Sequence, residues 1–348
     1  MLYQLGQMLT PVFGPFRLLT SYMFLITAGV TIAFFLTLFL LPKSVRLLPR
    51  DRGKEYAVQG SVGKGKPTGS GLAFISVFVV VSVLVVPFNM QQFSVIALTY
   101  VAMLTGFFDD RSERAWSEYV KAVLDLGIAL VAAFVLIGSR SRIWLPFFAG
   151  EFTVPVVPFM ILAVGILWLS INSTNCTDGV DGLSSTLAIL GLLSIGIFLY
   201  FVAGHSEISE YLLIPHYPDA ANWSVMTFVL VGCLSGYLWY NAYPSEIMMG
   251  DAGSRAVGFF LGVTVLIARN PFLILIVSTV ILVNGGTGLV KVTLLRFFNI
   301  RILHSVRFPL HDHFRNMKEW SNTQVLVRFS LIQILLIIVL FGMFLKVR

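Results

Sequence analysis

Apolar residues along this chain come in long blocks that are separated by short polar segments. A helix needs about 20 apolar residues to cross the hydrocarbon core of a bilayer. Blocks of this kind predict ten membrane-spanning helices, at residues 20–42, 71–87, 93–108, 119–138, 154–171, 183–204, 225–241, 255–267, 271–296 and 326–345. The eighth is short and is expected to tilt or to lie where the bilayer is locally thin. The pattern therefore predicts an all-α polytopic membrane protein.

The composition favours a membrane protein over a soluble one. Of the 348 residues, 57% are hydrophobic and only 12% are charged. Soluble domains carry about 25% charged residues, and a chain this apolar cannot cover a large core with a surface that water tolerates. Because no internal repeat or low-complexity segment divides the sequence, we expect one domain over residues 1–348.

The formal net charge of +7 is distributed unevenly among the loops. The loops after the first, third and ninth predicted helices contain Lys43, Arg46, Arg50, Arg52, Lys54, Lys64, Lys66, Arg111, Arg114, Arg301, Arg307, Arg315 and Lys318. The loops on the other side contain only Arg140, Arg142 and Arg269. Basic loops stay in the cytoplasm and contact anionic lipid headgroups, so the charge indicates membrane orientation and no nucleic-acid partner. With ten helices, both termini are expected outside.

The polar clusters that could carry chemistry all lie in loops on the predicted cytoplasmic side. They are residues 63–71, 109–110, 172–182, 241–254 and 311–313. Five segments that are distant in sequence are therefore expected to meet at one membrane face, where they would form a cytoplasmic-face active site. The loops on the opposite side have the composition of ordinary surface.

Asp109 and Asp110 follow directly after an apolar block. They could simply mark the point where a helix leaves the membrane. Acidic side chains near membrane depth are costly, however, and usually serve a function. Two adjacent carboxylates also repel each other and favour a nearby cation. The pair could bind Mg²⁺, accept a proton from an incoming nucleophile, or do both.

Residues 172–183 and 249–255 combine acids with glycine. Asp178 and Asp181 are three residues apart and share a face if the segment is helical; oxygen ligands of this kind suit a hard metal or a sugar nucleotide, although a capped turn would use the same residues. The alternating acids of an EF-hand are missing. Asp251 opens the eighth predicted helix and could be a plain helix cap. It could also hold Mg²⁺ while the first amides of the helix face phosphates.

The remaining polar positions have weaker signals. His311 and His313 alternate as in a zinc site, but no other ligand supports zinc; with Arg307 and Arg315 they could bind phosphate, or they could form a solvated basic loop. The glycine-rich segment 63–71 resembles a phosphate cradle but is not a Walker loop.

Inside the predicted helices, Lys121, Asp125 and Lys291 are costly unless they are paired or near headgroups. An Asn-Gly-Gly-Thr-Gly run at 284–288 is expected to bend or break the ninth helix.

Four motifs together resemble one enzyme family. They are residues 106–110, 172–183, 239–254 and 309–314. In this order they are similar to the polyprenyl-phosphate N-acetylhexosamine-1-phosphate transferases, and the last two favour the branch that uses a muramoyl-pentapeptide substrate. The chain departs from the family pattern where Asp312 replaces the middle of three histidines and Met248 replaces an aromatic residue.

The resemblance implies a fold, a reaction and site residues. It implies ten transmembrane helices, a homodimer in the bacterial inner membrane, and a Mg²⁺-dependent transfer of phospho-N-acetylmuramoyl-pentapeptide from its UDP derivative to undecaprenyl phosphate, giving lipid I and UMP. Asp251 would bind Mg²⁺, and Asp109 and Asp110 would act on the lipid phosphate. The residues that would bind substrate are Thr68, Lys121, Asn175, Asp178, Asp181, Asn241, His311 and His313.

Three alternatives stay open from the residues alone. A sister enzyme that transfers N-acetylglucosamine-1-phosphate to the same lipid would have nearly the same acidic motifs. A secondary transporter would place polar residues on broken helices near the middle of the bilayer, whereas here the acids gather at one face. A catalytically inactive scaffold would have the same spans.

Overall fold

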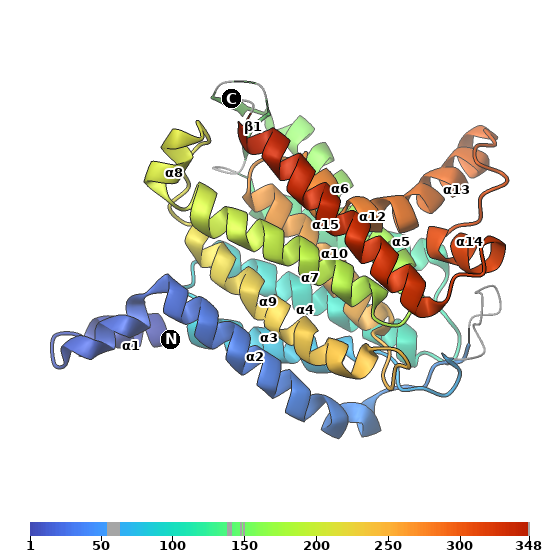
Figure 1. The fold of residues 1–348 in the computed structure, drawn as a ribbon, viewed down its shortest axis with the longest axis horizontal. Helices are drawn as coiled ribbons and strands as arrows, with labels where there is room; N and C mark the ends of the chain where they lie inside the picture. The colour runs from blue at the N-terminus through green and yellow to red at the C-terminus, as the bar shows by residue number, and fades with distance from the viewer. Residues whose placement is uncertain (54–62, 138–140, 147, 149, 347–348) are drawn as a thin grey trace.

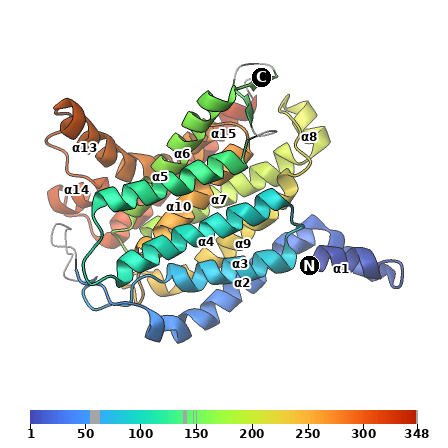
Figure 2. The same ribbon diagram turned by 180° about the vertical axis from the view of Figure 1, so that it is seen from behind.

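The computed structural model describes residues 1–53, 63–137, 141–146, 148 and 150–346. Long helices lie side by side and nearly aligned, with short helices at both ends of the bundle (Figures 1 and 2). The helices are α1 (Leu2–Leu9), η1 (Gly14–Thr20), α2 (Tyr22–Ser44), η2 (Val45–Leu47), α3 (Gly71–Val85), α4 (Met90–Arg111), α5 (Glu118–Val135), α6 (Val156–Thr177), α7 (Leu183–Ile197), η5 (Phe198–Ala203), α8 (Ser206–Tyr211), α9 (Ala220–Asn241), α10 (Gly250–Ile267), α11 (Leu273–Val277), α12 (Thr279–Ile281), η6 (Leu282–Gly286), α13 (Thr287–Phe298), α14 (Leu310–Met317) and α15 (Asn322–Lys346). Lys54 and Arg140, which entered the charge distribution above, lie outside the described residues.

The predicted multi-pass membrane protein is confirmed. Eight helices in the described residues are long and apolar enough to cross a membrane. Two more helices fall where spans were predicted, but α3 has only 15 residues and α5 carries Glu118, Lys121 and Asp125. The charges on α5 lie in its first two turns, near one end of the bundle, which is where charged side chains are tolerated best.

Helix α10 is the centre of the bundle and packs against α3, α4, α6 and α7. Every residue from Ala252 to Ile267 is buried. The prediction placed the start of this span at residue 255 and made it short. The helix in fact begins at Gly250 and has 18 residues, because Asp110 of α4 binds two of its first N–H groups and Lys121 and Asp125 of α5 pair with its Asp251 and Arg255.

The ninth predicted span is interrupted, as the Asn-Gly-Gly run suggested. It consists of α11, α12, the π-helical segment η6 and α13. Helix α13 has no buried residue and points away from the bundle beside α14 (Figure 1). The segment 301–320, expected to be a loop, contains the helix α14. The wider π-helical turn lets the chain change direction where Asn284 leaves the regular hydrogen-bond pattern.

The all-α prediction missed a small hairpin at the end of the bundle away from α14. Strand β1 (Arg142–Trp144) pairs antiparallel with β2 (Glu151–Thr153). Buried Trp144 anchors it by donating its indole N–H to the carbonyl of Ala268, 2.9 Å away. Tyr217 donates its hydroxyl to Glu151, 2.7 Å away. Burial and this carboxylate raise the pKa of Tyr217, so the hydroxyl stays a donor.

Both chain ends lie away from the end of the bundle where α14 and the starts of α5 and α10 are found (Figures 1 and 2). Helix α4 ends at the end of the bundle that contains α14, and helices α5 and α10 begin there. The acidic motifs on these helices are therefore brought to one end of the bundle, which we call the polar end.

Candidate active site

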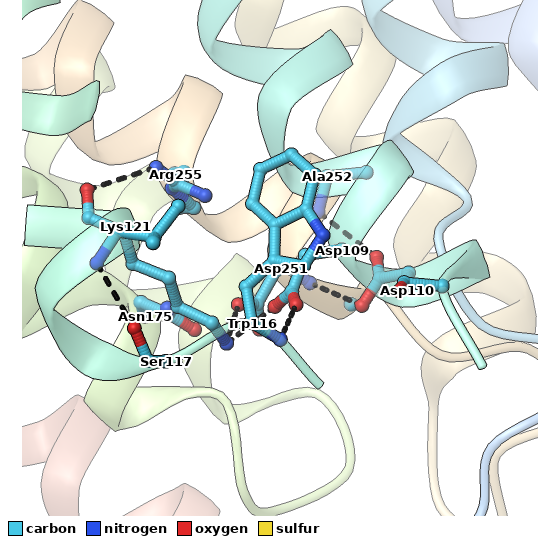
Figure 3. Close-up of polar contacts among 12 residues, drawn as sticks. Asp109, Asp110, Trp116, Ser117, Lys121, Asn175, Asp251, Ala252 and Arg255 are labelled. Atoms are coloured by element: carbon cyan, nitrogen blue, oxygen red, sulfur yellow. Dashed lines mark hydrogen bonds and ion pairs between the residues drawn. The ribbon is translucent and has the colours of Figure 1, made fainter. Parts of the chain in front are cut away.

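The first turn of α10 is held by a carboxylate from α4. The Oδ1 and Oδ2 atoms of Asp110 accept hydrogen bonds from the backbone N–H groups of Asp251, at 3.1 Å, and Ala252, at 3.0 Å (Figure 3). A helix leaves its first N–H groups without internal partners, and a negative charge at this end is favourable. Asp110 therefore caps α10 from another helix.

This cap corrects one part of the prediction for residues 249–255. In one of the two interpretations of this segment, the first amides of α10 faced substrate phosphates. The N–H groups of Asp251 and Ala252 are bound by Asp110 instead, so these two groups do not face a phosphate. Asp251 was considered as a residue that only caps the helix; the residue whose side chain caps α10 is Asp110.

Lys121 lies between two carboxylates. Its Nζ contacts Oδ2 of Asp109 and lies 3.0 Å from Oδ2 of Asp251. Asp109 also accepts a hydrogen bond from the backbone N–H of Trp116 at 2.7 Å (Figure 3). The Asp109 side chain is 5% exposed, that of Asp251 13% and that of Lys121 25%. One ammonium thus bridges the ends of three helices, α4, α5 and α10, and offsets the repulsion between their acids.

Gly106 permits this close meeting of helices. A Cβ atom at Gly106 would overlap the backbone carbonyl of Asp251. Because glycine has no side chain, α4 and the start of α10 pack backbone against backbone. This contact places Asp110, one turn further along α4, directly against the first N–H groups of α10.

A second group of predicted residues lies on the turn after α6. Asp178 follows the last residue of α6, and the turn at 178–182 leads into α7. The segment is not helical here, so the condition under which Asp178 and Asp181 would share a helical face is not met. Asp181 accepts from the hydroxyl of Ser245, at 2.8 Å, and from its backbone N–H, at 3.1 Å. The amide oxygen of Asn241 accepts from the N–H of Gly182 at 2.9 Å. These contacts fix the turn against the segment that leads into α10.

Asn175 and the glycine-rich segment complete the polar end. The hydroxyl of Ser254, on α10, donates to the amide oxygen of Asn175 at 3.2 Å. Thr68 is buried with its hydroxyl beside Gly250, and the N–H of Met248 donates to the carbonyl of Pro67 at 2.8 Å. The segment 63–71 therefore packs against the start of α10, whether or not it also contacts phosphate.

His311 joins α14 to the same group. Its side chain is 2% exposed, and its backbone N–H donates to the amide oxygen of Asn284, in η6, at 2.9 Å. The His311 ring lies directly on Gly179, where a Cβ would approach Nε2 to 2.5 Å. His313 is half-buried and accepts from the N–H of Arg307 at 3.3 Å. The five predicted segments do meet at one end of the bundle, through the hydrogen bonds and packing contacts described for each of them.

Several residues in these contacts were absent from the predicted site. Asn284, Ser245 and Arg255 each bind a predicted residue or its neighbour. Asn284 was noticed only as a helix breaker, and Arg255 only as the last residue of a motif. The sequence signal that could have singled out Arg255 is an arginine within the first turns of an apolar span.

The residues of the polar end fit Mg²⁺ as a partner shared with substrate. No group of three or more His, Cys, Asp or Glu side chains in the described ranges has the spacing of a complete metal cage. Mg²⁺ does not need one, because it is usually bound by one or two carboxylates together with water and substrate phosphates. The partly exposed carboxylate of Asp251, with Asp109 beside the same lysine, meets that requirement.

The cap predicts a difference between two substitutions at Asp110. Asp110→Ala should lower the free energy of unfolding by about 2 kcal/mol, because two partly buried N–H groups lose their acceptor. Asp110→Asn should lose less, because its amide oxygen still accepts. Thermal unfolding in detergent, followed by tryptophan fluorescence, would compare them. Equal melting temperatures for the alanine variant and the unchanged protein would contradict the capping role.

The fold and the polar end together define a multi-pass membrane protein with its charged site at the ends of the helices. The chain belongs to glycosyl transferase family 4, which its residues 92–269 match. Among its relatives is the phospho-N-acetylmuramoyl-pentapeptide-transferase of Treponema pallidum strain Nichols, 50% identical over 342 residues that cover 97% of this chain and 94% of the relative. Proteins of the same name from Wolinella succinogenes and Campylobacter lari are 30% and 31% identical over 88% and 91% of this chain and 90% and 95% of their own.

Proposed function

We propose that this protein transfers phospho-N-acetylmuramoyl-pentapeptide from UDP-N-acetylmuramoyl-pentapeptide to undecaprenyl phosphate, which yields lipid I and UMP. The observation that carries the proposal is the Asp109–Lys121–Asp251 cluster at the ends of membrane helices, in a chain half identical to a relative of that name. A phosphate anchored in the membrane and a nucleotide from water can meet only at such a surface.

The reaction joins two anions, so the site has to offset negative charge. An oxygen of the lipid phosphate forms a bond to the β-phosphorus of the nucleotide, and the bond from that phosphorus to UMP breaks. Lys121 provides a fixed positive charge beside the transferring phosphoryl group. Asp109, bound by Lys121 and by the N–H of Trp116, orients the ammonium.

Asp251 is the proposed Mg²⁺ ligand. The metal would supply positive charge to the phosphates of both substrates. Asp110 fixes the first turn of α10, and therefore the position of Asp251, by its two hydrogen bonds. Asn175, near the end of α6, is bound by Ser254 of α10, and Asp178 and Asp181 lie on the turn that follows α6. These three residues are the proposed nucleotide site. His311 holds that turn to α14 through its contact with Gly179.

The proposed membrane arrangement follows the charge of the loops. We place the polar end at the cytoplasmic face of the bacterial inner membrane. Helices α3 and α5 would complete ten spans, with both chain ends outside, in a single domain that forms a homodimer. Helix α5 lies among the spanning helices α4 and α6, which supports its inclusion despite its charges.

An assay of UMP release tests the activity. Purified protein in detergent, with undecaprenyl phosphate and Mg²⁺, should release UMP from UDP-N-acetylmuramoyl-pentapeptide and not from UDP-N-acetylglucosamine, and chelation of Mg²⁺ should stop the release. Faster release from UDP-N-acetylglucosamine would favour the sister enzyme. Release from neither substrate by well-folded protein would overturn the proposal in favour of a transporter or an inactive scaffold.

A further inference from the structure

Beyond Glu118, the first residue of α5, the first turns of α5 and α10 carry four charged side chains in two layers. Lys121 and Asp125 are four residues apart on α5, as are Asp251 and Arg255 on α10. In the outer layer, Lys121 pairs with Asp251. In the inner layer, Nη2 and Nε of Arg255 lie 2.5 and 3.0 Å from Oδ1 of Asp125. The sign of the charge therefore alternates along each helix, and each pair joins the two helices.

The two layers differ in exposure. The inner side chains are almost fully buried, at 1% for Arg255 and 2% for Asp125, whereas Lys121 is 25% exposed. Nη2 of Arg255 also lies 3.5 Å from the backbone carbonyl of Lys121 (Figure 3). The inner pair thus lies directly beneath the Lys121–Asp251 contact, one helical turn further from the polar end.

Stability alone does not explain the inner pair. The cost of removing two charges from water can exceed their attraction, and apolar side chains of similar size are often as stable or more so. Nη1 of Arg255 is also buried with no acceptor among the described residues, which adds the cost of an unsatisfied donor. Four charges in this arrangement therefore call for another explanation than the packing of α5 on α10.

The spacing on each helix gives that explanation. Side chains four residues apart on a helix are neighbours, and opposite charges there attract. Lys121 could therefore turn inward to Asp125, and Asp251 could turn to Arg255. Either change would remove a charged group from the site. Because Arg255 and Asp125 bind each other, neither of them competes for the ammonium or the carboxylate of the outer layer.

We propose that the Arg255–Asp125 pair positions Lys121 and Asp251 for phosphoryl transfer by satisfying the two charges that would otherwise bind them within their own helices. The proposal rests on the function proposed above for the Asp109–Lys121–Asp251 cluster. Arg255 and Asp125 are positioning residues, since they act on the reaction only through their outer neighbours.

Three variants of the full-length protein test this role: Arg255→Met, Asp125→Asn and the double variant. Arg255→Met leaves Asp125 to bind Lys121, so kcat should fall by about 10²-fold, the scale of a displaced catalytic group. The reactivity of Lys121 toward an amine-modifying reagent, measured by mass spectrometry, should fall several-fold as the ammonium moves inward. In the double variant no inner charge remains, and both the rate and the labelling should return to the order of the unchanged protein.

The labelling separates positioning from simple support of the fold. A folded Arg255→Met protein with unchanged Lys121 labelling would overturn the proposal, whatever its rate. If Arg255→Met does not fold, Asp125→Asn is compared with the double variant. In Asp125→Asn, Arg255 has lost its partner and is left to bind Asp251, so adding Arg255→Met should raise kcat. An unchanged kcat would overturn the proposal. Labelling does not require turnover. A wild-type protein that fails to release UMP would therefore contradict the proposed function while leaving the labelling result to decide on the pair.

Discussion

Asp251→Asn should lower kcat by about 10³-fold, because loss of a metal ligand removes several kcal/mol of transition-state stabilisation and about 1.4 kcal/mol corresponds to a factor of ten. The substitution preserves size, and the backbone N–H of residue 251 can still donate to Asp110. The protein should therefore remain folded and monodisperse, with its melting temperature close to that of the unchanged chain. UMP release at saturating Mg²⁺ measures the effect.

A matched substitution at the other end of the bundle serves as the control. Asp219 precedes the first residue of α9, whose last turn is at the polar end, so Asp219 is a whole helix length away from Lys121. Asp219→Asn makes the same chemical change and should leave the rate unaffected. If Asp251→Asn retained roughly a tenth of the rate at saturating Mg²⁺, the assignment of a metal ligand would be wrong.

The sequence was sufficient to predict a helical, multi-pass membrane protein and the meeting of its polar segments at one end of the bundle. The bilayer limits the possible structures, because backbone groups in hydrocarbon must be hydrogen-bonded within a helix or a closed barrel. An apolar block of sufficient length is therefore expected to form a membrane-spanning helix. The side of each loop then follows from counting spans. This is why the five polar segments could be assigned to one face before any contact between them was known.

The contacts within the polar end could not be predicted in the same way. Asp110 binds N–H groups 141 and 142 residues further along the chain, and Arg255 binds Asp125 across 130 residues. The start of α10 was misplaced for this reason, since a run of Gly, Asp, Ser and Arg favours a loop unless distant side chains satisfy it. The burial of His311 depends likewise on Asn284 and Gly179, which lie in other segments.

Lys121→Met should lower kcat by about 10²-fold or more, the usual effect of removing one preorganised group that stabilises developing charge. It should also destabilise the protein, since Asp109, only 5% exposed, would lose its cation. These two effects can be separated. The double variant Lys121→Met with Asp109→Asn removes the uncompensated carboxylate, so it should regain melting temperature without regaining rate.

Lys291 provides the control for a lysine within a predicted span. Its ammonium donates to the carbonyls of Leu303, at 3.0 Å, and Val306, at 2.8 Å, and so supports the chain between α13 and α14. Lys291→Met should lower the melting temperature and leave kcat per folded molecule close to that of the unchanged protein. If Lys121→Met behaved in this way, with a normal rate per folded molecule, its ammonium would be only a bridge between helices. A rate that stays low in the double variant, after stability has returned, would instead identify Lys121 as a group that acts on the phosphates.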